Sequence, residues 1–233
     1  MNPLRKALVV VVAAAVGFAG GATGAGLRPV PAGAQQVRLD TAKRLATAAI
    51  TRRVLALREL MTAAKSIVRL SDADRSALTT QLQDQVNGLT SLNAKIQGDN
   101  DEATVRADAQ KIITDYRVYV LTIPKARGVV VADIELNAED RLSKLADRLQ
   151  SMIDQASGKD TTKAKSYLAS LRAKLTSVTG TVSPLPASLL ALQPSGYPAN
   201  HTTLESARTS LRTGRQGLAD AATLARQVIA DLK

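Results

Sequence analysis

The fold is decided by residues 50–96, which read ITRRVLALRELMTAAKSIVRLSDADRSALTTQLQDQVNGLTSLNAKI. Apolar residues recur three or four positions apart on both sides of Ser71, which predicts two amphipathic helices over about 41–70 and 72–97. Ser71 is a good N-cap residue, and Asp74 can reach back to it. So short a connection makes the helices antiparallel neighbours. The two stripes comprise Ile50, Val54, Leu57, Met61, Ala64 and Val68, then Leu78, Leu82, Val86, Leu89, Leu92 and Ile96.

The same spacing predicts four further helices, over about 102–121, 125–156, 161–178 and 202–232. Residues 116–123 (YRVYVLTI) could also read as a strand, but no second strand-like run lies nearby to pair with them. We therefore expect a helix there, which Pro124 breaks or kinks. Gly214 and Gly217 lie inside the last predicted helix, so its middle is either weak or closely approached by a neighbour.

A proline-rich stretch separates the last helix from the others. Pro184, Pro186, Pro194 and Pro198 forbid a long helix in this region and leave room for one turn at most. We expect an ordered crossing loop or a linker here.

These elements predict an all-α fold, an elongated helical bundle with coiled-coil-like antiparallel helices. The expected parts are a signal peptide over 1–34, a helical bundle over 35–178, the Pro-rich crossing loop over 179–201 and a C-terminal helix over 202–233 that packs on the bundle.

The amino-acid composition also favours a core made of narrow interfaces between helices. Hydrophobic residues make up 45% of the chain, but aromatic residues only 2%, and there is no Trp. A core of Leu, Ile, Val, Met and Ala suits helix packing better than the wide interior of a sandwich or barrel. The chain has no Cys, which excludes disulfides, thiolate metal sites and thiol nucleophiles.

The first residues resemble an export signal. Arg5 and Lys6 precede the apolar run Ala7–Val16, and a small-residue stretch ends at Ala32-Gly33-Ala34. A basic head, an apolar run of this length and an A-x-A site predict a cleaved secretory signal peptide. The alternative is an uncleaved membrane anchor, because residues 7–27 are uncharged and long enough to span a bilayer. Either way we expect a secreted or extracytoplasmic envelope location.

The net charge of +11 points to anionic partners, and its densest block lies in the first predicted helix. An exported protein meets membrane head groups and wall polymers before nucleic acid, so we expect no nucleic-acid partner. A basic amphipathic helix can rest on an anionic surface. Alternatively, Arg44, Arg58 and Lys65 line the apolar seam and pair with carboxylates of a neighbouring helix. The candidate contacts for an anionic surface are Arg52, Arg53, Arg58, Lys65 and Arg69.

No residue pattern indicates catalysis. Four acids lie within two turns of one predicted helix, but glycosidases need aromatic side chains that stack on sugars, and this chain has few. We interpret the four as a solvated helix face. They are Asp133, Glu135, Glu139 and Asp140.

His201 is the only histidine, which excludes metal sites built on several histidines. We expect it to be exposed at the start of the last helix. Tyr116 and Tyr119 lie three apart and are interpreted as core or boundary residues. No cofactor, metal or small-molecule ligand is expected.

Two segments carry a family resemblance: Ile50-Thr51-Arg52-Arg53 opening a leucine-rich helix, and Thr114-Asp115-Tyr116-Arg117-Val118-Tyr119 before Pro124. With them, residues 45–155 resemble a group of uncharacterised secreted all-helical proteins of high-GC Gram-positive bacteria. The resemblance implies export and a helical bundle, and it carries over no activity and no functional residue.

We therefore expect a non-enzymatic, exported interaction or structural protein of the cell envelope. Two alternatives stay open. The first is a binder of anionic membrane or wall-polymer surfaces through the first helix, and the second is an envelope protein that acts like a chaperone.

Overall fold

The structure is a computed structural model that describes residues 32–156 and 160–233. The described residues form helices and no strand, so the all-α prediction is confirmed for them. The predicted signal peptide lies outside the described residues, apart from its last three, which open the first described helix. The elements are α2 (Ala32–Ser66), α3 (Asp72–Gly98), α4 (Glu102–Thr114), the π-helical turn η1 (Val118–Thr122), α5 (Ile123–Gln155), α6 (Thr162–Val182), α7 (Leu185–Leu190), the 3-10 turn η2 (Pro194–Gly196) and α8 (Asn200–Asp231).

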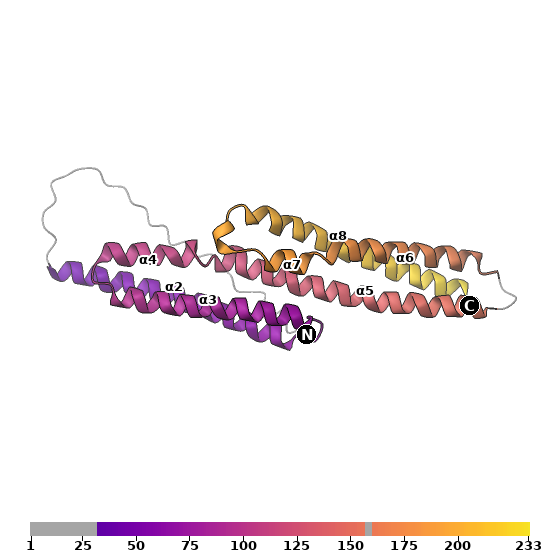
Figure 1. Ribbon diagram of the computed structural model, residues 1–233, viewed down its shortest axis with the longest axis horizontal. Coiled ribbons are helices and arrows are strands. Elements are labelled where there is room, and N and C mark those ends of the chain that lie inside the picture. The colour runs from indigo at the N-terminus through magenta and orange to yellow at the C-terminus, as the bar shows by residue number, and fades with distance from the viewer. Residues whose placement is uncertain (1–31, 157–159) are drawn as a thin grey trace.

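The molecule is elongated, with helix packing typical of a bundle at each end (Figure 1). Helices α2, α3 and α4 contact one another at one end, and α5, α6 and α8 contact one another at the other. The segments α4, η1 and α5 follow one another along the long axis. A single line of helical segments thus connects the two ends.

Buried side chains form two clusters that share α5. The first cluster draws on α2, α3, α4, η1, α7 and the start of α5 as far as Ala132, with the adjoining ends of α6 and α8. The second cluster begins at Ala146 on α5 and is completed by α6 and α8. Because α5 supplies side chains to both, neither cluster is complete without it.

The hairpin of α2 and α3 forms as predicted around Ser71. The Ser71 hydroxyl accepts a hydrogen bond from the Asp74 N–H at 3.1 Å and donates one to the Asp74 carboxylate at 2.9 Å. All six predicted stripe residues of α3 are buried. The first helix differs from prediction, since it starts at Ala32 and ends at Ser66 rather than 70. Val68 therefore lies in the turn and is 93% exposed.

The predicted helix over 102–121 is interrupted earlier than expected, at Asp115–Arg117, and not at Pro124. Arg117 is in the left-handed region with φ 47°, which redirects the chain after α4. Pro124 then sits in the first turn of α5, where a missing N–H is tolerated. The π-turn η1 precedes it, and its wider hydrogen bonding, with the Ile123 N–H donating to the Val118 carbonyl, joins η1 directly to α5.

The proline-rich stretch is more helical than predicted. Helix α6 continues to Val182, and α7 adds a helix of six residues that buries Leu185, Pro186 and Leu189. Leu189 packs against Gly128 of α5, where an added Cβ would lie 2.6 Å from Leu189 Cδ1. Proline at the start of α7 favours its short helix.

Helix α8 packs against α6 and α5 along nearly its whole stripe. The middle of α8 carries Gly214 and Gly217, both buried. A Cβ on either would lie 2.5 Å from a valine methyl of α6, that of Val182 or Val178. The close neighbour at these glycines is therefore the side-chain surface of α6.

Candidate functional site

The five basic residues predicted to contact an anionic surface are spread around α2 and the turn after it. Arg52, Arg58 and Lys65 are exposed in α2, Arg69 is exposed in the turn, and Arg53 is half-buried. At about 100° per residue, Arg52 and Arg58 are ~120° apart around the helix axis, and Arg53 and Arg58 ~140° apart. The structure therefore does not bring the five together on one face.

Arg53 is held within the molecule. Its guanidinium lies 5.1 Å from the centre of the Tyr119 ring and donates a hydrogen bond to the Ala49 carbonyl at 3.0 Å. Burial lowers the pKa of Arg53 below its usual value. Tyr119 and Tyr116 pack against the first cluster, which confirms the interpretation of both as core or boundary residues.

The alternative role for the basic residues of α2, pairing with carboxylates of a neighbouring helix, is not found. Among residues 32–156 and 160–233, no ion pair involves Arg44, Arg58 or Lys65. Helix α2 is instead tied to α3 by hydrogen bonds such as Lys43 Nζ to the Gln97 carbonyl and the Thr47 hydroxyl to Asn93, both at 2.8 Å. The exposed arginines of α2 thus keep their charge directed at solvent.

Two of the four acids interpreted as a solvated face are buried, so that interpretation is wrong for Asp133 and Glu135. They are 6% and 4% exposed, whereas Glu139 is half-buried and Asp140 is exposed. Each buried acid faces a different element across the middle of the molecule. Burial could not be read from the local pattern, because the partners are 62 and 80 positions away in sequence.

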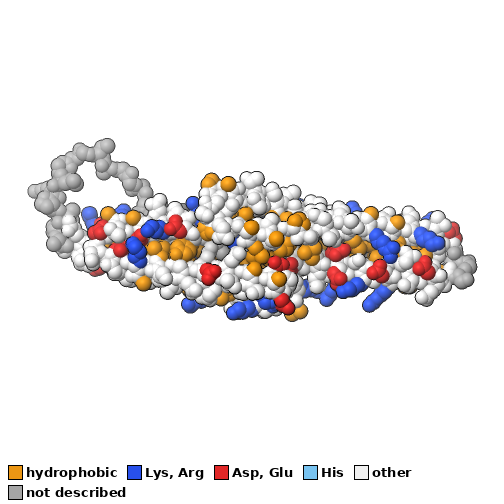
Figure 2. Space-filling view, viewed as in Figure 1, with side chains coloured by type: hydrophobic (Ala, Val, Ile, Leu, Met, Phe, Trp, Pro, Cys, Tyr) orange, Lys and Arg blue, Asp and Glu red, His pale blue; other side chains and the backbone are white. Residues whose placement is uncertain are grey.

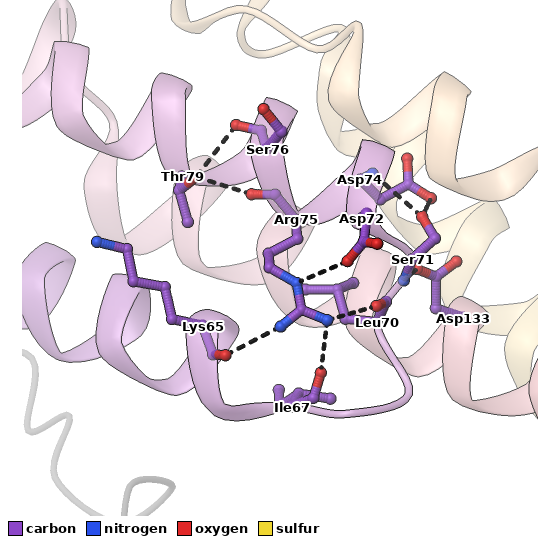
Figure 3. Close-up of polar contacts among 10 residues, drawn as sticks. All are labelled: Lys65, Ile67, Leu70, Ser71, Asp72, Asp74, Arg75, Ser76, Thr79 and Asp133. Atoms are coloured by element: carbon purple, nitrogen blue, oxygen red, sulfur yellow. Dashed lines mark hydrogen bonds and ion pairs between the residues drawn. The ribbon is translucent and has the colours of Figure 1, made fainter.

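Asp133 fastens the α2–α3 turn onto α5. Its Oδ2 accepts a hydrogen bond from the Ser71 backbone N–H at 2.7 Å, as Figure 3 shows at the start of α3. Burial raises the pKa of Asp133, the Ser71 N–H opposes that rise and the neighbouring Asp74 carboxylate adds to it.

Arg75 holds the same turn from the other side. Its guanidinium donates to the carbonyls of Lys65 at 2.9 Å, Ile67 at 3.1 Å and Leu70 at 2.7 Å. Figure 3 shows the guanidinium reaching from α3 into the turn, with Asp72 beside it. These carbonyls include ones that the end of α2 leaves without an intrahelical partner, so the Arg75 guanidinium caps the C-terminus of α2.

Glu135 is buried without a hydrogen-bond partner for either carboxylate oxygen among the described residues. Its one ion-pair partner is Arg215 of α8, whose Nε lies 3.6 Å from Oε1. Its Oε2 lies 2.7 Å from the position that a Cβ on Gly214 would take. Burial raises the pKa of Glu135 to about 7, and Arg215 only partly offsets this.

Lys125 is buried beside the proline-rich stretch. Its ammonium donates to the Leu192 carbonyl at 2.8 Å, which ties the chain after α7 to the start of α5. Burial lowers the pKa of Lys125 to about 8. By contrast, the buried Asp108 is paired with two lysines, Lys111 at 2.8 Å and Lys95 of α3, and their hydrogen bonds lower its pKa.

None of these groups forms a metal-binding arrangement in the part of the chain that the structure describes. No cluster of three or more His, Asp or Glu side chains suited to a metal ion occurs among the described residues. His201 is exposed at the start of α8, as expected. A groove of about 400 Å³ runs between α6 and α8 and is lined in part by Lys174, Arg212 and Asp220.

Comparison with protein-family models, with curated proteins and with solved structures finds no match to this chain. Within the described residues, none of the helices combines the length and hydrophobicity needed to cross a bilayer.

Proposed function

We propose that this chain is an exported, non-catalytic interaction protein of the cell envelope that acts as an elongated helical spacer between partners. The observation that supports this most directly is the line α4–η1–α5, which runs through both ends of the molecule. A protein built in this way presents separate helical surfaces at a fixed distance from each other.

Packing along the rod supports a stiff spacer. The α2–α3 and α6–α8 pairs are antiparallel and in extensive contact. The buried residues of α6 alternate between spacings of four and three, and those of α3 are each three or four positions apart. We propose coiled-coil-like seams at both pairs, since this spacing favours shallow crossing angles.

Surface chemistry supports a role in contacts with other molecules. Figure 2 shows charged side chains of both signs along the rod and a group of hydrophobic side chains near its middle, around α7. Export is supported by the pattern of residues 1–34.

Fractionation of cells that produce the native protein tests the export part of the proposal. We expect the protein in the medium or the membrane fraction, and N-terminal sequencing should place its first residue near Gln35 if the signal is cleaved. A product confined to the cytosol would contradict export.

Photo-crosslinking in cells tests the interaction part. We would place a crosslinking amino acid at Gln83 on α3 and at Ser170 on α6, which are exposed in the two ends of the rod, with the buried Leu82 as the control position. Adducts of defined mass at Gln83 or Ser170 and none at Leu82 are expected. The spacer role is ruled out if neither Gln83 nor Ser170 gives an adduct. The non-catalytic part is ruled out if the purified chain turns over substrates in a broad hydrolase panel.

A further inference from the structure

Helix α2 has an exposed side that combines apolar and basic residues. Val37, Leu45 and Leu55 are 63%, 52% and 53% exposed, although large aliphatic side chains are usually buried. Arg38, Arg44 and Arg52 on the same helix are also exposed. We call this set the outer face of α2; its members are Val37, Arg38, Arg44, Leu45, Arg52 and Leu55.

Helical geometry places these side chains together. Val37 and Leu55 are 18 residues apart, which is five full turns, so they lie on one line along the helix. At about 100° per residue, Arg44 lies ~20° to one side of that line, and Leu45 and Arg52 lie ~80° and ~60° to the other. The whole outer face fits within an arc of ~120°, and Glu59 is the one acid in that arc.

The described elements of this chain leave the outer face uncovered. Helices α3 and α4 pack on other sides of α2, where Ala46, Ile50 and Leu57 are buried. Arg38 and Arg52 form no ion pair with any described residue, and Arg44 contacts only the nearby Thr41 hydroxyl, at 3.2 Å. The outer face therefore offers apolar area together with positive charge that is not neutralised.

The order of the sequence indicates what covers this face. Residues 7–27 carry no charge, and only residues 28–31 separate them from Ala32, where α2 begins. If the uncharged run stays in a bilayer, α2 starts within ~15 Å of chain length of the membrane surface. A helix face on which apolar side chains alternate with arginines matches the interface of a bilayer, where the apolar groups enter and the long arginine side chains extend so that their guanidinium groups meet phosphates.

We propose that the outer face of α2 binds the surface of an anionic phospholipid bilayer. This names one partner for the proposed spacer and rests on its export to the envelope. In this arrangement Val37, Leu45 and Leu55 enter the interface, and Arg38, Arg44 and Arg52 contact lipid phosphates. The remaining faces of α2 stay packed on α3 and α4.

The absence of Trp from the sequence allows a direct test. The full-length variant Leu55→Trp is mixed with vesicles of phosphatidylglycerol or of phosphatidylcholine. We expect a blue shift of Trp emission, and its quenching by lipids with brominated acyl groups, on phosphatidylglycerol only. The variant Met152→Trp places the reporter on an exposed site at the far end of α5, and it should show neither effect.

Charge reversal separates the outer face from general attraction of a basic protein to anionic lipid. In the Leu55→Trp background, Arg44→Glu with Arg52→Glu should lower the apparent vesicle affinity at least tenfold. The matched control, Arg141→Glu with Arg148→Glu on exposed positions of α5, changes net charge equally and should have a much smaller effect. Circular dichroism of each variant verifies that its helical content is retained.

The proposal is overturned if Leu55→Trp shows no shift on phosphatidylglycerol, shifts equally on phosphatidylcholine, or is affected as much by the α5 reversal as by the α2 reversal. Because the vesicle assay uses purified protein, its result does not depend on cellular location. A failure here leaves the spacer role to the crosslinking experiment, and a cytosolic product would remove export without changing the vesicle result.

Discussion

Single residues on α5 connect the two halves of the molecule through buried polar contacts. Lys125 reaches the Leu192 carbonyl, Asp133 accepts from the Ser71 N–H, and Glu135 faces Gly214 and Arg215 of α8. The first two have well-formed hydrogen bonds, whereas neither oxygen of Glu135 has one among the described residues. Since a buried charge without a hydrogen bond is costly, the charge of Glu135 weakens the fold even beside Arg215.

The pKa of Glu135 makes stability depend on pH. Its folded value of about 7 lies above the ordinary 4.5, so the folded protein holds this proton more tightly than the unfolded protein. The free energy of unfolding should therefore fall as pH rises from about 4.5 to about 7, by on the order of 3 kcal/mol from this group. Glu135→Gln should remove that contribution, and urea unfolding followed by circular dichroism at pH 4.5 and 8 measures it.

Glu139→Gln, one turn further along α5, is the matched control for this substitution. We expect Glu135→Gln to be more stable than the native protein at pH 8 and similar to it at pH 4.5, while Glu139→Gln follows the native curve. Equal effects of the two variants at pH 8 would contradict a special role for Glu135.

A second prediction at the scale of one residue concerns Arg75. Arg75→Lys keeps the positive charge but cannot donate to the carbonyls of Lys65, Ile67 and Leu70 together, because an ammonium lacks the planar fork. We expect a loss of about 1–3 kcal/mol in the free energy of unfolding, measured in urea. Arg69→Lys, exposed in the same turn, should change it by less than about 0.5 kcal/mol.

At the scale of helices, how well the sequence predicts burial depends on how many neighbours a helix has. In α3 every predicted stripe residue is buried, because the helix turns one narrow side to the core. In α5 the apolar Met152 is 50% exposed, whereas the charged Glu135 is buried. Helix α5 serves two clusters with different neighbours, so a single stripe cannot describe it.

The same reasoning explains the limits at the candidate site. The basic character of α2 could be read from the sequence, and so could the cap at Ser71. Which face of α2 stays uncovered depends on where α3 and α4 pack, and that information is not local. The interruption at Arg117 was missed because no glycine marks its positive φ.

At the scale of helices, the close packing of α6 against α8 predicts the effect of enlarging a glycine at their contact. Gly217→Ala adds a methyl group 2.5 Å from the Val178 Cγ2 position, so either the Val178 side chain or the helices must shift. We expect a loss of about 1–3 kcal/mol in unfolding free energy, despite the better helix propensity of Ala. Thermal and urea unfolding of the purified variant measure this loss.

Two further variants test whether the clash is the cause. Gly180→Ala on α6 has nothing within 4 Å of its added Cβ and should be stabilised by up to about 1 kcal/mol. Combining Gly217→Ala with Val178→Ala should cost less than the sum of the single effects. If the two effects simply add, the contact between the helices is not what the glycine protects.

At the scale of the whole molecule, the in-line arrangement of α4 and α5 sets its dimensions. Their 13 and 33 residues, at about 1.5 Å each, extend over ~70 Å. A compact protein of 233 residues would have a radius of gyration of ~17 Å. We expect small-angle X-ray scattering to give a clearly larger value and an asymmetric distance distribution, and a symmetric distribution near 17 Å would contradict the elongated fold.

The left-handed backbone of Arg117 interrupts the line of α4, η1 and α5, so a change in its dihedral angles would tilt η1 and α5 relative to α4, with Arg117 as the pivot. Over a helix of ~50 Å, a tilt of 10° at that pivot would carry the tip near Gln155 through ~9 Å. The contacts of Lys125 with Leu192 and of Asp133 with Ser71 brace the arm close to its pivot, where a small displacement must be resisted. Weakening either of these two contacts should therefore displace most the residues at the opposite end of the rod, which contact neither pair.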